Sequence, residues 1–371
     1  MPSGPLGSRR EGPFFAVAHK ALARSGRGAA AERDMTYPDK KVAEAPDVDD
    51  GGFAEIVAHG RPVVLRGLVA AWPAVDAGAS PDSLARYIAR FDRGAPVEGF
   101  VAPAQARGRF FYKDDMTGFN FERRQGRIGD VAAHLARQSA LSDVPSVYVG
   151  SAPVPECLPG FELDNALPLL AGKAAVPRIW IGNATLVAPH FDLSDNIACV
   201  VAGRRRFVLF PPEQVANLYV GPLDHTMAGQ PASMVDPRDP DFGRYPLYRR
   251  ALDAAEVAEL GPGDAIYIPS PWWHQVEAPP GFNALVNYWW DDVPADSGSP
   301  FEALVHGIFA MGPQSEARRR AWRAMFDHFV FQTEGDPAAH LAPEHRGILA
   351  ASDPPLRARI RGFLLKMLSR R

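Results

Sequence analysis

The feature that most constrains the fold of this 371-residue chain is a series of short strand-like segments between Ser146 and Trp290. The segments are rich in β-branched and aromatic residues, and Gly, Pro and Asn separate them, which is the pattern of β-strands joined by turns. They are S-V-Y-V-G, R-I-W-I-G-N, H-F-D, N-I-A-C-V-V, R-F-V-L-F, D-A-I-Y-I-P and N-A-L-V-N-Y-W-W. Between the fourth and fifth, A-G-R predicts a hairpin turn. Many short antiparallel strands without regular intervening helices predict a β-barrel or a double-sheet jelly roll.

Helical patterns flank this series. F-A-E-I-V-A-H predicts a short helix before a buried strand at Pro62–Leu65, and Pro81–Phe91 has helical spacing with Ser80 in place to cap it. Ile128–Ser139 predicts another amphipathic helix, and helices return after Pro300. The expected organisation is a basic tail (1–34), an α/β elaboration (35–125), a jelly-roll domain (126–295) and a C-terminal helical region (296–371). The predicted fold class is mainly β with α elaborations, around a double-stranded β-helix core of the jelly-roll or cupin kind.

Composition excludes several classes of protein. The chain is 46% hydrophobic and 22% charged with a net charge of −3, so it reads as a soluble globular protein with no global attraction to nucleic acid. We find no apolar run long enough to span a membrane. Cys157 and Cys199 are the only cysteines, which favours a reducing, cytoplasmic compartment.

The first 34 residues are rich in Gly, Ala and Arg, and F-F-A-V-A is too short for the apolar part of a secretory signal. We interpret them as a disordered tail. A transit peptide and an upstream extension that is not natively translated, with Met35 as the start, remain alternatives.

The residues that carry the chemistry are His190 and Asp192, in A-P-H-F-D-L-S-D-N, and His274, in I-P-S-P-W-W-H. Alternate side chains of a strand share one face, so His-x-Asp on a strand presents both groups together. A distant histidine then completes two imidazoles and one carboxylate, the facial triad of non-haem Fe(II) oxygenases, which leaves positions open for a co-substrate and O₂. His-x-Asp alone is weak in a chain with ten histidines, and His274 alone is as well explained by packing in an aromatic cluster.

Four segments together resemble the cupin-like JmjC group of Fe(II)- and 2-oxoglutarate-dependent oxygenases. They are H-F-D-L-S-D-N, A-G-R-R-R-F-V-L-F-P-P-E-Q, L-G-P-G-D-A-I-Y-I-P-S-P-W-W-H and L-V-N-Y-W-W. The similarity spans about Gly60 to Asp292 and is closest to the asparaginyl hydroxylases and the bacterial cupin-like proteins of the group. It implies iron held by His190, Asp192 and His274 as the catalytic centre, with 2-oxoglutarate and O₂ as co-substrates. Hydroxylation of a protein side chain or a small molecule is the implied reaction, and demethylation would be the same step on an N-methyl group.

The resemblance also implies a co-substrate pocket. Its implied members are Tyr148, Asn196, Asn287 and Trp289, each of which is also compatible with a packing or strand-edge role. The lysine that binds 2-oxoglutarate in the group falls at Arg205, which can grip a carboxylate through a bidentate fork. A hydroxyl-bearing residue of the group falls at Val187, so that contact is lost unless Thr185 supplies it.

Two other readings stay open. The barrel could hold Zn, Mn or Ni for isomerase or hydrolytic chemistry, or the chain could be a non-catalytic binding module. The segment around Tyr112, Lys113, Asp114 and Asp115 could rim the site or be a surface loop.

No membrane or nucleic-acid partner is expected, but a homodimer is. The apolar stripe that would form it is Leu356, Ile360, Phe363, Leu364 and Met367. In the related asparaginyl hydroxylases the C-terminal helices form the dimer interface, whereas packing onto the chain's own barrel is the alternative.

Overall fold

The computed structural model describes residues 38–369, so the expected tail at 1–34 lies outside the described residues. Within the described part of the chain, no helix is both long and apolar enough to cross a membrane. The chain divides into two units, residues 1–290 and residues 291–371.

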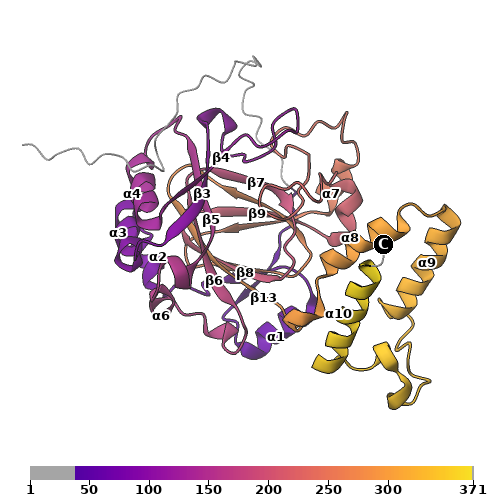
Figure 1. The fold of residues 1–371 in the computed structure, drawn as a ribbon. Helices are drawn as coiled ribbons and strands as arrows, with labels where there is room; N and C mark the ends of the chain where they lie inside the picture. Colours follow the sequence, from indigo (N-terminus) through magenta and orange to yellow (C-terminus); the bar gives the residue numbers. More distant parts are fainter. Residues whose placement is uncertain (1–37, 370–371) are drawn as a thin grey trace, which may run out of the picture. The chain divides into compact units, whose positions relative to one another are not determined.

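The first unit is built on two β-sheets, visible at the centre of Figure 1. The larger sheet has nine strands in the order β1-β2-β11-β8-β13-β6-β5-β3-β4, and the smaller has four in the order β10-β9-β12-β7. The larger sheet comprises β1 (Ala43–Pro46), β2 (Val63–Arg66), β11 (Ala265–Ile268), β8 (Asp195–Ala202), β13 (Asn283–Trp290), β6 (Val176–Gly182), β5 (Ser146–Pro153), β3 (Pro96–Ala102) and β4 (Glu122–Arg127). The smaller comprises β10 (Glu256–Leu260), β9 (Arg205–Phe210), β12 (Trp273–Ala278) and β7 (Thr185–His190). All neighbouring strands are antiparallel except β1 and β2.

The two sheets pack face to face, which confirms the predicted jelly roll. Strand β8, in the middle of the large sheet, is apolar along most of its length because both of its faces are buried. Its Ala198 and Val200 join Phe207 and Leu209 of β9 in a core between the sheets. Its alternate residues, among them Cys199, face a second core on the other side. A strand buried on both faces reads as a continuous hydrophobic run, because neither face meets water.

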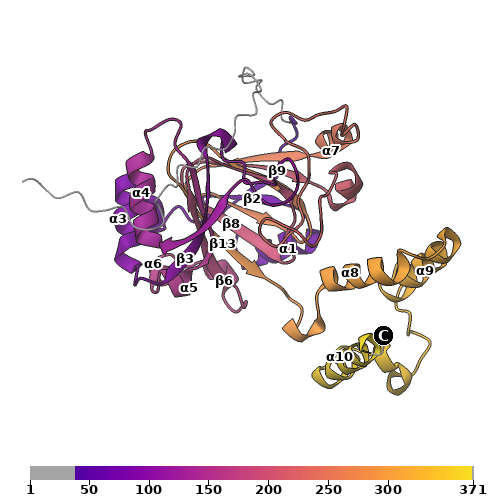
Figure 2. The ribbon, with the colours of Figure 1, turned by 45° about the horizontal axis from the view of Figure 1, so that its top comes forward.

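Helices supply that second core. They are α1 (Asp50–His59), α2 (Pro73–Ala77), α3 (Pro81–Phe91), α4 (Ile128–Gln138), α5 (Val154–Cys157) and α6 (Phe161–Asp164), with α7 (Tyr248–Ala254) packing on the smaller sheet instead. Figures 1 and 2 show α3 and α4 side by side against the large sheet. The prediction for α3 is confirmed, since Ser80 Oγ accepts a hydrogen bond from the backbone N–H of Ser83 at 3.2 Å.

The predicted A-G-R hairpin is wrong. Strand β8 pairs with β11 and β13 in the large sheet, whereas β9 pairs with β10 and β12 in the small one. The turn at Gly203, with φ of +73°, therefore carries the chain from one sheet to the other. A tight turn with a left-handed glycine suits either connection, so local sequence does not distinguish them.

The second unit contains three longer helices, α8 (Pro300–Met311), α9 (Glu316–Phe329) and α10 (Pro354–Leu368), as expected from the change of pattern after Pro300. Ser299, Ser315 and Asp353 cap their N-termini. Of the apolar stripe on α10, Leu356 is buried, while Phe363 and Leu364 are 61% and 49% exposed.

Candidate metal centre

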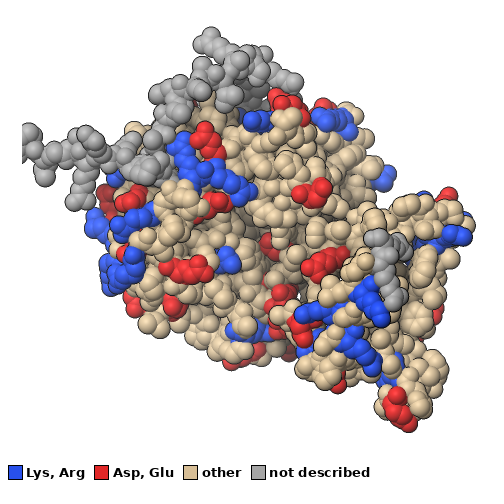
Figure 3. Space-filling view, viewed as in Figure 1, with Lys and Arg blue, Asp and Glu red and all other residues tan. Residues whose placement is uncertain are grey.

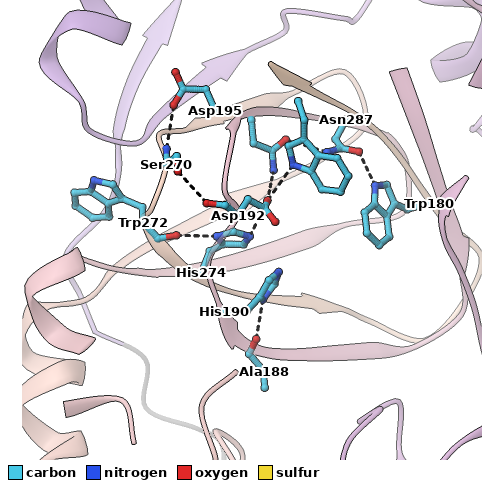
Figure 4. A network of polar contacts seen from close by, with 11 residues as sticks. Trp180, Ala188, His190, Asp192, Asp195, Ser270, Trp272, His274 and Asn287 are labelled. Atoms are coloured by element: carbon cyan, nitrogen blue, oxygen red, sulfur yellow. Dashed lines mark hydrogen bonds and ion pairs between the residues drawn. The ribbon is translucent and has the colours of Figure 1, made fainter. Parts of the chain in front are cut away.

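His190, Asp192 and His274 come together at one end of the small sheet (Figure 4). Strand β7 ends at His190, and β12 pairs with it so that His274 is the register partner of His190. The two imidazole rings lie 4.3 Å apart between centroids, and His274 Nε2 lies 3.6 Å from Asp192 Oδ2. One ligand atom from each residue falls within 4.8 Å of the others. The three predicted ligands therefore form one cluster.

Both histidines are oriented by backbone carbonyls two residues before them. His190 Nδ1 lies 2.9 Å from the Ala188 oxygen, and His274 Nδ1 lies 3.1 Å from the Trp272 oxygen (Figure 4). A proton on Nδ1 satisfies each carbonyl and leaves Nε2 with a free lone pair, which is the tautomer that a metal requires. Burial, and then the neighbouring His190, lower the pKa of His274 to about 4. Near neutral pH this ring is accordingly uncharged and able to act as a ligand.

Asp192 lies beyond the strand, not on it. Because β7 ends at His190, the expectation that strand alternation aligns the His-x-Asp pair is wrong. Hydrogen bonds hold the aspartate instead, with Asn196 Nδ2 and Trp289 Nε1 donating to Oδ2 at 3.1 and 3.0 Å. Ser270 holds the backbone of the turn that contains Asp192. Its hydroxyl donates to the Asp192 carbonyl and its N–H donates to Asp195 Oδ1, each at 3.0 Å. These contacts replace strand geometry in placing the carboxylate.

The donor set fits a divalent transition-metal ion. Two imidazoles and one carboxylate suit Fe(II), and His190, Asp192 and His274 would hold such an ion as a two-histidine, one-carboxylate oxygenase centre does. The other side opens into a cavity of about 800 Å³. A co-substrate and a substrate group therefore both have space beside the cluster.

Five of the six predicted co-substrate residues line this cavity, namely Tyr148, Asn196, Arg205, Asn287 and Trp289. Thr185 does not line it, although Val187 does, because two residues along the strand move the hydroxyl out of the pocket. The structure thus gives no support for Thr185 as the missing hydroxyl. Tyr112, Lys113, Asp114 and Asp115 are not part of the wall either, and the neighbouring Phe110 and Phe121 line it instead.

Arg205 is the most unusual group in the cavity wall. It is only 4% exposed, and its one side-chain hydrogen bond to a described residue runs from Nη1 to the Arg204 carbonyl at 3.2 Å. No carboxylate of residues 38–369 lies within ion-pair distance of it, and burial lowers its pKa to about 10. Arg206, on the opposite face of β9, pairs with Glu259 at 2.8 Å. A buried guanidinium without a counter-ion is costly, so the geometry favours an anion at this position.

Sequence reasoning missed Trp180 and Ser270. Trp180 lines the cavity, stacks on Tyr148 with 5.6 Å between ring centroids, and donates from Nε1 to Asn287 Oδ1 at 2.7 Å. Its only sequence signal was its place in the aromatic strand R-I-W-I-G-N. For Ser270 no local pattern indicated a contact with a turn more than 70 residues earlier.

Comparison with known proteins identifies a family and several relatives. The profile of the family described as "Cupin-like domain" matches residues 51–296. Lysine-specific demethylase JMJ31 of Arabidopsis thaliana is 33% identical over 30% of this chain, and tRNA wybutosine-synthesizing protein 5 of Gallus gallus is 34% identical over 36%. Bifunctional peptidase and (3S)-lysyl hydroxylase JMJD7 of Homo sapiens is 26% identical over 64%.

The matched regions differ in how much of each relative they cover. They amount to 20% of the Arabidopsis protein, 43% of the chicken protein and 80% of the human protein. The range matched by the family profile, residues 51–296, contains all three clustered residues.

Proposed function

The chain belongs to the cupin-like family, in its JmjC branch, and from this premise we propose that it is an Fe(II)- and 2-oxoglutarate-dependent oxygenase that hydroxylates its substrate. His190, Asp192 and His274 would hold the iron. When bound, the iron and its co-substrates supply the oxidising chemistry that inserts oxygen into a C–H bond. The protein's own part is to orient the reactants and to keep water out.

The observation that carries the proposal is the guanidinium of Arg205, which lines the same cavity as the cluster and has no carboxylate partner among residues 38–369. A dicarboxylate has one end for the metal and a second carboxylate for a distant cation. Arg205 can form a bidentate, charge-assisted pair with that second carboxylate. Tyr148 lies close enough to Arg205 to interact with its charge, and it offers a hydroxyl in the same part of the cavity.

The relatives' names and the cavity wall indicate the class of primary substrate. The relatives are described by their names as a lysine demethylase, a lysyl hydroxylase and a wybutosine-synthesizing protein. We propose a protein side chain or a small molecule as substrate, because the cavity that contains the metal cluster is also lined by the apolar Phe110 and Phe121. We also propose a cytoplasmic protein, in keeping with Cys157 and Cys199, both of which are free and buried.

Anaerobic titration tests the proposal. Adding Fe(II) and then 2-oxoglutarate to the purified protein is expected to produce the visible charge-transfer band of a chelated 2-oxo acid, with one iron per chain. His190→Ala and Asp192→Ala should each abolish both iron binding and the band. Stoichiometric iron retained by both variants would rule out this centre, and iron binding without the band would favour a cupin metalloprotein of other chemistry.

A further inference from the structure

A chain of hydrogen bonds runs across the inner wall of the cavity and ends on Asp192 (Figure 4). Trp180 Nε1 donates to Asn287 Oδ1 at 2.7 Å, and Asn287 Nδ2 donates to Asn196 Oδ1 at 3.2 Å. Asn196 Nδ2 then donates to Asp192 Oδ2 at 3.1 Å. The first three residues come from β6, β13 and β8, which are neighbours in the large sheet. The chain of bonds therefore crosses three adjacent strands.

The chemistry of the two ends gives this chain of bonds one direction. An indole N–H can only donate, and an ionised carboxylate can only accept. Each amide between them must therefore turn its oxygen toward Trp180 and its nitrogen toward Asp192. Without the indole donor, the Asn287 side-chain oxygen would lose its one hydrogen-bond partner among the described residues, and only the Asp192 end would still fix the two amide orientations.

Burial makes that direction matter. Asn196 is 6% exposed and Asn287 is 2% exposed, so water cannot readily replace a lost partner. At the end of the chain, Asn196 and Trp289 both donate to Oδ2 of Asp192. Oδ1 receives no hydrogen bond from a described residue, whereas Oδ2 also lies 3.6 Å from His274 Nε2, so both donors act on the carboxylate oxygen beside that histidine.

We propose that Trp180, Asn287 and Asn196 form a positioning relay that sets the orientation of the Asp192 carboxylate and thereby the affinity of the centre for its metal ion. The proposal rests on the metal centre of the proposed function. It assigns the two asparagines a role different from the co-substrate contact that the family resemblance implies. It also brings in Trp180, which touches none of the three clustered residues through a hydrogen bond.

Metal binding in the absence of co-substrate separates the two roles. The probe is anaerobic Fe(II), titrated into the full-length protein in competition with a chromophoric chelator. Hydrogen-bonding partners of metal ligands typically change affinity by about 10- to 100-fold when removed. Asn196→Leu removes the last donor of the relay and should weaken Fe(II) binding toward the upper end of that range. Trp180→Phe removes only the first donor and should weaken it by about 10-fold.

Trp72→Phe is the matched control. The Trp72 indole N–H donates to the Ala166 carbonyl at 2.8 Å in the helical layer, and the residue is 5% exposed. It should lose a similar hydrogen bond and similar thermal stability without any change in Fe(II) affinity.

Wild-type Fe(II) affinity in Trp180→Phe would overturn the relay. If Trp180→Phe does not fold, the same result in Asn196→Leu would overturn it, and a fall in 2-oxoglutarate affinity alone would return the asparagines to co-substrate binding. A wild-type protein that binds no Fe(II) would be a different result, because it would refute the proposed function itself.

Discussion

Replacing Arg205 by methionine tests the co-substrate assignment through two quantities that should move in opposite directions. Methionine keeps an unbranched apolar side chain but carries no charge, so it offers no partner to an anion. We expect the free energy of unfolding of the metal-free protein to rise and the affinity for 2-oxoglutarate to collapse. A residue with a purely structural role would not produce this combination.

The expected rise in the free energy of unfolding follows from the pKa of Arg205. Burial lowers the pKa of Arg205 from 12.5 to about 10, and each pKa unit corresponds to about 1.36 kcal/mol. A base with a lower pKa in the folded state destabilises that state at every pH below about 10, and the penalty disappears only as the pH rises toward 12.5. At neutral pH the full penalty is present, so Arg205→Met should stabilise the metal-free protein by up to about 3 kcal/mol.

The expected loss of affinity for 2-oxoglutarate follows from the lost ion pair. Removing one partner of a buried charge pair costs about 2–5 kcal/mol, which corresponds to an affinity roughly 30- to 4000-fold weaker. Urea unfolding of the metal-free protein measures the first quantity, and 2-oxoglutarate titration of the Fe(II) protein measures the second.

Arg206→Met is the control for both measurements. Arg206 is the next residue of β9, and its side chain is 37% exposed and paired with Glu259 and Glu277. Its loss should change stability by less than about 1 kcal/mol and leave 2-oxoglutarate binding intact. If Arg205→Met binds 2-oxoglutarate with wild-type affinity, Arg205 is not the anchor. If the metal-free variant is less stable than the wild type, the unpaired charge is not the cost that we infer.

Two further predictions concern other parts of the chain. Burial raises the pKa of the Cys157 thiol to about 12, and it raises the pKa of the Cys199 thiol as well. Neither thiol should therefore react with iodoacetamide at pH 8 in the folded protein, whereas both should react in urea. Rapid labelling of the native protein, measured by mass spectrometry, would contradict this prediction. We propose that the exposed side chains of α10 form a homodimer interface, so light scattering should give about 81 kDa, twice the 40.3 kDa of one chain. Replacing Phe363 and Leu364 by Glu should halve that mass while the control Lys366→Glu does not, and a wild-type mass near one chain would refute the dimer.

Local sequence predicted those elements whose signals lie within a few residues of one another. The helix Pro81–Phe91 had an apolar period and a capping serine, and it begins and ends where expected. Strand β4, at the edge of the sheet, had no comparable strand signal in its sequence, because E-R-R-Q-G-R contains no apolar residue. Its pairing with β3 arises from the sheet and not from its own composition.

Residue types also predicted which side chains form the site. They did not predict which contacts hold those side chains in place. His190 and His274 face one another because β7 and β12 pair in one particular register, which depends on the packing of two sheets. The carboxylate of Asp192 is held by Asn196 and Trp289, which are register partners on β8 and β13. Sequence indicated these residues only through their match to a family.

The inward direction of Arg205 was predictable from sequence, whereas the contact of Trp180 was not. Strand alternation alone separates Arg205 from Arg204 and Arg206, so a regular strand already predicts that one of three arginines turns inward. Its lack of a carboxylate partner among the described residues, by contrast, depends on every strand around the cavity, as does the bond from Trp180 to a residue 107 positions later. Electrostatic and hydrogen-bonding roles in this centre are therefore properties of sheet register. For that reason the most informative substitutions remove a single donor or charge and leave the strands unchanged.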